Sequence, residues 1–83
     1  MEASFKQPLY LTKEQRYQNF LTQLTSLIAG EKEEISILAN TTAALKEAFG
    51  FFWIGFYLVK NNELILGPFQ GSVACYRIKK GRG

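Results

Sequence analysis

The residues best suited to chemistry in this chain include two aromatic side chains that flank a glycine. Trp53, Gly55 and Tyr57 are spaced by two, and an extended strand would place all three on one face. Because Gly55 has no side chain, the two rings are predicted to form the walls of a pocket, about 13 Å apart. The gap between them would hold a small amphipathic or cationic group. The alternative is an aromatic core face that other chain covers, with Gly55 admitting a neighbouring backbone.

The second candidate is Cys75, the only cysteine. A lone cysteine is commonly a small buried hydrophobic residue. Arg77 lies two residues further on and would share its strand face, and a nearby cation favours the reactive thiolate. On these residues alone, a buried inert thiol and a reactive thiol both stay open.

Composition excludes several other kinds of site. The chain has no histidine and no aspartate, so it cannot assemble a plausible zinc site or a histidine-based triad, and we predict neither a metal nor a cofactor. A single cysteine cannot form an internal disulfide. The N-terminus lacks the order of a signal peptide, and no apolar run reaches the ~20 residues that span a bilayer. We therefore expect a cytoplasmic protein with no membrane partner.

The net charge of +3 is concentrated near the C-terminus, in Arg77, Lys79, Lys80 and Arg82. A basic tail of this kind can contact phosphates. It is short and contains no recognisable nucleic-acid-binding motif, so no nucleic-acid partner is predicted.

Two helices are expected to follow an irregular arm over residues 1–11. Thr12 and Gln15 have the spacing of a capping box, which starts the first helix, and Gly30 suits its end. A second helix is expected to begin in the acidic run from Glu31 to Glu34 and to stop at Gly50. The predicted apolar stripes are Tyr17, Phe20, Leu21, Leu24, Leu27 and Ile28, and then Ile35, Leu38, Thr42, Leu45 and Phe49.

Strand patterns follow the second helix. Residues 51–60 are rich in aromatic and β-branched residues, and Asn61-Asn62 is a turn candidate, so residues 51–66 are predicted to form a β-hairpin. Gly67-Pro68 is expected to end the ladder. The side chains expected to pack under the helices are Phe52, Ile54, Phe56 and Leu58.

A short third strand over residues 73–78 and a loop over 79–83 complete the pattern. The whole pattern predicts an α+β fold with two N-terminal helices packed on an antiparallel sheet. A sheet of two or three strands leaves an open edge and is marginal in water, so more chain or a partner is expected.

Four runs of residues resemble the free methionine-(R)-sulfoxide reductases, which are GAF-domain enzymes. The runs are Trp53–Leu58, Leu64–Gly71, Ala74–Ile78 and Gly81–Gly83, with a further similarity at Leu38–Thr41. The resemblance implies a GAF-like fold in which residues 12–83 form the N-terminal half of the domain, truncated after the third strand. Lys79 and Tyr76 depart from the family pattern.

The resemblance also implies a reaction and its partners. In this family a cysteine thiolate attacks the sulfur of free methionine sulfoxide, a second cysteine resolves the sulfenic acid as a disulfide, and thioredoxin reduces that disulfide. Cys75 matches the resolving cysteine, and Trp53 and Tyr57 match substrate-binding aromatics. The family forms homodimers and uses no cofactor. The attacking cysteine and the acidic residues that hold the substrate's amino group are expected beyond Gly83, so these 83 residues alone are expected to be inactive.

Two other functions stay open at this point. One is a non-catalytic GAF module that binds a small ligand, and the other is an inactive truncated fragment. The second is consistent with the open sheet edge, which would promote aggregation or domain swapping.

Overall fold

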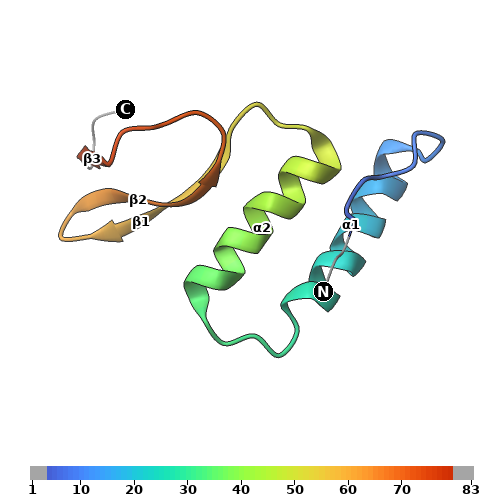
Figure 1. Ribbon diagram of the computed structural model, residues 1–83, viewed down its shortest axis with the longest axis horizontal. Coiled ribbons are helices and arrows are strands. Elements are labelled where there is room, and N and C mark those ends of the chain that lie inside the picture. Colours follow the sequence, from blue (N-terminus) through green and yellow to red (C-terminus); the bar gives the residue numbers. More distant parts are fainter. Residues whose placement is uncertain (1–3, 80–83) are drawn as a thin grey trace.

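The chain folds as two helices followed by a three-stranded antiparallel sheet (Figure 1). This is a computed structural model, and it describes residues 4–79. The elements are α1 (Lys13–Ile28), α2 (Glu34–Phe49), β1 (Ile54–Lys60), β2 (Glu63–Gln70) and β3 (Arg77–Lys79), and the strand order is β1-β2-β3. The predicted α+β class is confirmed.

The predicted start and end of α1 are confirmed in detail. The Thr12 side chain accepts the backbone N–H of Gln15, and the Gln15 side chain accepts the backbone N–H of Thr12, which is a complete capping box. Gly30 follows the C-cap with a φ of +82°. Glycine adopts this left-handed conformation without the steric penalty that a Cβ would bring.

The helix α2 begins at Glu34, at the end of the acidic run Glu31–Glu34 in which its start was expected. Glu31 lies in the connection, where its carboxylate accepts the backbone N–H groups of Lys32 and Glu33, each at 3.1 Å. A carboxylate that binds these amides favours a local turn over a further helical turn. The predicted stop at Gly50 is confirmed, with a left-handed φ of +66°.

The helix α2 lies between α1 and the sheet (Figure 1). Ala44 is buried in a cluster with Phe5 and Phe20 on the α1 side. Thr42, which belongs to the predicted stripe, is fully buried, and two residues of helix place it about 200° around the axis from Ala44. Ala44 lies outside the predicted stripe, so the stripe describes only part of the buried surface of α2.

The β1–β2 hairpin has the predicted turn. Asn61 and Asn62 both have positive φ, at +49° and +64°, and Lys60 pairs with Glu63 across them. Two central residues with positive φ match the right-handed twist of the flanking strands.

The predicted end of the ladder at Gly67-Pro68 is wrong, because β2 continues to Gln70. The pairing shifts there: Tyr57 pairs with Leu66 and Gly55 with Phe69, so Gly67 and Pro68 together face one residue of β1. This is a β-bulge, and a bulge is a position where a sheet accepts a proline that cannot donate a hydrogen bond.

The third strand is shorter and later than predicted. Residues 73–76 form no strand, and β3 covers only Arg77–Lys79, which pair with β2. Lys79 therefore belongs to the strand, and the remainder of the predicted loop, residues 80–83, lies outside the described residues. The backbone N–H of Leu66 donates to the carbonyl of Tyr76 at 2.8 Å, which returns the chain to β2 just before β3 begins.

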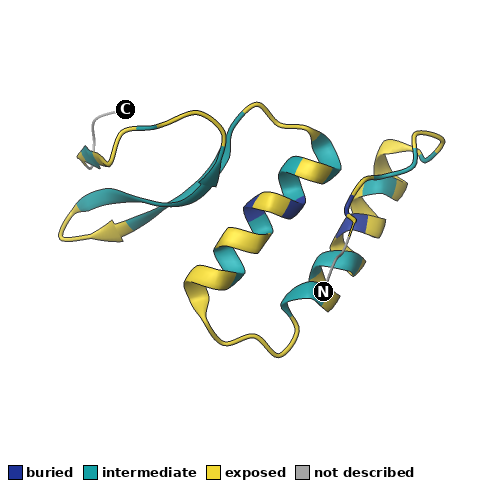
Figure 2. Cartoon of the chain, in the orientation of Figure 1, coloured by how far each residue is buried: buried dark blue, intermediate teal, exposed yellow. Residues whose placement is uncertain are grey.

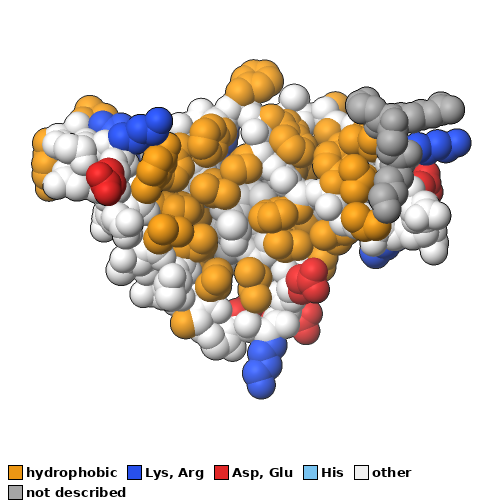
Figure 3. Space-filling model, turned by 180° about the vertical axis from the view of Figure 1, so that it is seen from behind, with side chains coloured by type: hydrophobic (Ala, Val, Ile, Leu, Met, Phe, Trp, Pro, Cys, Tyr) orange, Lys and Arg blue, Asp and Glu red, His pale blue; other side chains and the backbone are white. Residues whose placement is uncertain are grey.

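Burial is concentrated where the N-terminal arm meets the two helices (Figure 2). Hydrophobic side chains also gather across the middle of one face, with charged side chains toward its margins (Figure 3). Phe52 is 86% exposed, so its predicted place under the helices is wrong. It precedes β1, whose first residue is Ile54, and the alternation of faces along a strand does not extend to it.

Candidate functional site

The predicted aromatic pair lies on one side of the sheet. The rings of Trp53 and Tyr57 stack with 6.4 Å between their centroids and 26° between their planes. Phe69 joins them from β2, with its ring stacked on Trp53 at 5.6 Å and 16°. The three rings form an aromatic cluster, which we define as Trp53, Tyr57 and Phe69. Only the first two were predicted as site residues.

The predicted gap of about 13 Å between the walls is wrong. Trp53 precedes β1, and its indole lies across Gly55: a Cβ built on Gly55 would be 2.6 Å from Cη2 and 3.1 Å from Cζ3 of Trp53. The space that the missing side chain leaves is therefore occupied by the neighbouring tryptophan. Gly55 thus allows the aromatic rings to stack and does not open a pocket between Trp53 and Tyr57.

Two hydrogen bonds join the aromatic cluster to the connection between β2 and β3. The indole Nε1–H of Trp53 donates to the carbonyl of Ser72 at 3.0 Å, and the Tyr57 hydroxyl donates to the carbonyl of Cys75 at 2.9 Å. Both polar tips of the pair are thus used to fix the backbone of this loop, which we call the 71–76 loop.

Gly71 allows the loop to approach the indole. Its φ is +135°, and a Cβ built on it would be 2.7 Å from Cδ1 of Trp53 and 3.1 Å from the carbonyl of Phe52. No L-residue fits this backbone and this contact without rearrangement. A Gly-Ser pair such as Gly71-Ser72 is typical of a turn, but it does not indicate what the turn will contact.

Cys75 is exposed, so the interpretation as a buried residue is wrong. It lies in the 71–76 loop and not in a strand, because β3 begins at Arg77. The argument from a shared strand face with Arg77 therefore does not hold. What brings Cys75 to the aromatic cluster is the hydrogen bond between its carbonyl and the Tyr57 hydroxyl.

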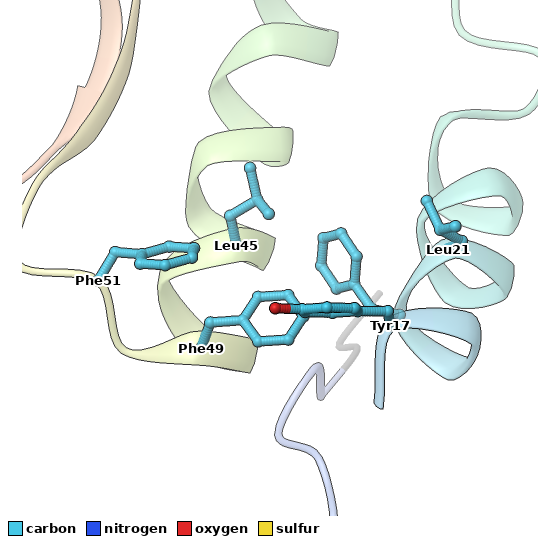
Figure 4. Close-up of a pocket in the computed structure, with 6 residues that line it drawn as sticks. Tyr17, Leu21, Leu45, Phe49 and Phe51 are labelled. Carbon is cyan, nitrogen blue, oxygen red and sulfur yellow. The ribbon is translucent and has the colours of Figure 1, made fainter. Parts of the chain in front are cut away.

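A hollow of about 370 Å³, which was not predicted, lies between α1, α2 and the residues that follow α2 (Figure 4). Its lining is entirely aromatic and aliphatic: Tyr17, Phe20, Leu21, Leu45, Phe49 and Phe51. Tyr17 is 45% exposed and Leu21 is 53% exposed, although both belong to the predicted stripe of α1. The hollow shares no lining residue with the aromatic cluster, and the Tyr17 hydroxyl is the one polar group among its lining side chains.

Residues 4–79 contain no group of three histidine, cysteine, aspartate or glutamate side chains that could bind a metal ion. Neither α1 nor α2 combines the length and the hydropathy that crossing a bilayer requires.

Solved structures of similar sequence match this fold. The X-ray structure of the free methionine-R-sulfoxide reductase from Neisseria meningitidis in complex with its substrate superposes on the whole chain with a TM-score of 0.89 and 48% identity, and the match covers 50% of that protein. A structure described as the GAF domain superposes on 99% of the chain with a TM-score of 0.81 and 32% identity. The predicted GAF-like fold is confirmed.

Sequence relatives agree with the structural match. The free methionine-R-sulfoxide reductase of Escherichia coli is 43% identical over 74 residues, which are 88% of this chain and 45% of that protein. In sequence and in fold, the chain is thus related to the free methionine-(R)-sulfoxide reductase family of GAF-domain proteins. The GAF domain-containing protein A of Dictyostelium discoideum is 60% identical over 73 residues, or 87% of this chain and 46% of that protein.

Two further facts define the extent of the family match. The chain spans about half the length of the relatives it matches. The superposition on the N. meningitidis structure covers the whole chain and therefore includes the aromatic cluster. A scan against models of protein families finds no match.

Proposed function

We propose that this chain supplies the substrate-holding half of a free methionine-(R)-sulfoxide reductase, with Trp53 and Tyr57 as substrate-binding residues and Cys75 as the resolving thiol. The observation that carries the proposal is that these three residues lie next to one another. The rings stack at 6.4 Å, and Tyr57 holds the backbone of an exposed cysteine through a 2.9 Å hydrogen bond. The relative from N. meningitidis, solved with its substrate, supports it.

The ring geometry defines how the sulfoxide would lie. Placing a methyl group between two facing rings requires about 7–8 Å, because each carbon contact takes 3.5–4.0 Å. The centroids of Trp53 and Tyr57 are 6.4 Å apart, which is too close for insertion. The methyl and sulfur end of the substrate would therefore pack across the accessible surface of the two rings. Polarisable sulfur packs favourably near aromatic rings.

The proposed reduction balances with two thiols and one external reductant. An attacking thiol, which is not among these residues, takes oxygen from the sulfoxide to give methionine and a sulfenic acid. The Cys75 thiol then attacks the sulfenic sulfur, so an S–S bond forms, the S–O bond breaks and water leaves. A dithiol such as thioredoxin returns the disulfide to two thiols by exchange and becomes oxidised. With one cysteine, the 83-residue chain cannot complete this sequence by itself.

The test is consumption of free methionine-(R)-sulfoxide by the full-length product of the gene, with thioredoxin, thioredoxin reductase and NADPH as the recycling system. Turnover is expected, and Trp53→Leu is expected to raise KM roughly tenfold or more, since burial of a large apolar contact contributes 1.5–3 kcal/mol. Tyr76→Leu is the matched control, because Tyr76 is 79% exposed and lies outside the aromatic cluster. Absence of turnover in the unmodified protein would refute the proposal.

A non-catalytic ligand-binding module is the second candidate, and one observation favours it. A protein 60% identical to this chain is named only for its GAF domain. This candidate predicts binding of a small ligand at the aromatic cluster that Cys75→Ser leaves unchanged, with no oxidation of NADPH in the recycling assay.

A further inference from the structure

The Trp53 indole lies against a glycine backbone along each of two edges. A Cβ at Gly55 would lie 2.6 Å from Cη2, on the six-membered ring, and a Cβ at Gly71 would lie 2.7 Å from Cδ1, on the five-membered ring. Real Cβ atoms do not approach other atoms so closely. The indole therefore lies in a slot that only glycine at both positions leaves open.

The face of the indole is supported by Phe69. Phe69 pairs with Gly55 across β1 and β2, and a Cβ on Gly55 would lie 2.5 Å from the Cβ of Phe69. The bare backbone of Gly55 thus lets Phe69 and Trp53 meet, and their rings stack at 5.6 Å and 16°. An aromatic pair of this geometry is more favourable than its buried area alone would give.

The polar atom of the indole has a partner as well. Nε1–H of Trp53 donates to the Ser72 carbonyl at 3.0 Å, from the 71–76 loop. The side chain is therefore restrained along both edges, on a stacked face and at its nitrogen. A substrate-binding side chain that is fixed before the ligand arrives loses less conformational entropy on binding.

We propose that Phe69 is a positioning residue, which acts through Trp53 by fixing the indole in the orientation that receives the substrate. Gly55 and Gly71 set the width of the slot. The role of Trp53 toward substrate rests on the proposed function, whereas the slot itself is a property of the free protein. A purely structural role for Phe69 would predict lost stability without a specific effect on the indole or on KM.

The first test measures the slot without substrate. Trp53 is the only tryptophan of the 83-residue chain, so tryptophan fluorescence reports on it alone. Phe69→Leu is expected to increase quenching of Trp53 by acrylamide, and Phe69→Tyr, which keeps a stacked ring, is expected to restore the original value. Equal quenching in Phe69→Leu and the unmodified chain overturns the inference. Nuclear Overhauser contacts between the indole and the Phe69 ring in the unmodified chain are also expected, and their absence overturns it even where a variant fails to fold.

The second test uses turnover by the full-length gene product. Phe69→Leu is expected to raise KM roughly two- to tenfold, the range that one aromatic pair supports, with a smaller change in kcat. Phe69→Tyr is expected to recover the original KM. An unchanged KM in Phe69→Leu overturns the inference, and so does an equal rise in both variants. If the unmodified protein has no turnover while the slot measurements hold, the proposed function fails and the slot stands.

Discussion

At the scale of single residues, the site is shaped as much by missing side chains as by present ones. Gly55 and Gly71 each leave the space that the Trp53 indole occupies. The aromatic residues were visible in the sequence, and so was the glycine between Trp53 and Tyr57. The orientation of the indole could not be predicted from the sequence, because the rotamer of a side chain near a strand end depends on neighbours from another strand. Phe69 was missed for the same reason.

Gly71→Ala is expected to destabilise the fold by about 1–3 kcal/mol, the cost of holding a side chain in a backbone conformation that only glycine adopts readily. It should also shift the emission of Trp53, because the new methyl group would meet Cδ1. Urea unfolding and the emission spectrum measure the two effects.

Gly30→Ala is the control for Gly71→Ala. Gly30 also has positive φ, at +82°, but a Cβ there would meet nothing within 4 Å. A loss of stability of about 1–2 kcal/mol is expected from the left-handed backbone alone, without any change in Trp53 emission. Unaltered emission in Gly71→Ala would contradict the described contact.

At the scale of elements, local signals predicted the boundaries that depend on local chemistry. The capping box at Thr12, the glycine stops and the Asn61-Asn62 turn are all confirmed, since each is decided by residues within a few positions. Predictions that depended on distant contacts failed. The strand continued past Gly67-Pro68 because a bulge admits the proline, and β3 began late because the 71–76 loop is held by Trp53 and Tyr57.

Thr12→Ala tests the element-scale account at α1. Loss of the cap is expected to reduce the free energy of unfolding by about 1 kcal/mol, because alanine has no side-chain oxygen to accept the backbone N–H of Gln15. The second bond of the capping box remains available, since its donor is the backbone N–H of residue 12. Thr22→Ala in the same helix is the control: its exposed hydroxyl donates only to the Gln18 carbonyl, and alanine has the higher helix propensity. Urea unfolding followed by circular dichroism compares them, and a loss in Thr22→Ala as large as in Thr12→Ala would count against the cap.

At the scale of the whole molecule, a small core depends on an arm that has no regular structure. The buried hydrophobic residues of the described chain are Phe5, Phe20 and Ala44. Phe5 packs edge to face on Phe20 at 5.8 Å, and its backbone N–H donates to the Glu47 carboxylate. The sequence predicted an irregular arm but gave no sign that it would complete the core, because a single phenylalanine has no periodicity.

Phe5→Ala is expected to cost about 3–5 kcal/mol, as for other buried phenylalanines, which is a large part of the stability of a domain this size. Leu9→Ala is the matched control from the same arm, since Leu9 is 88% exposed, and it should change stability by no more than about 0.5 kcal/mol. Thermal and urea unfolding measure both variants. Similar small effects in the two variants would mean that the arm does not belong to the core.

The central claim is that Cys75 works with the Trp53–Tyr57 pair as the resolving half of a sulfoxide reductase site. The most direct measurement treats the full-length gene product with free methionine-(R)-sulfoxide without a reductant and maps its thiols by peptide mass spectrometry. The account predicts a new disulfide that includes Cys75, and in Cys75→Ser a sulfenic acid on the partner cysteine that dimedone captures, with methionine still formed. Cys75 recovered as a free thiol after methionine has formed would contradict it.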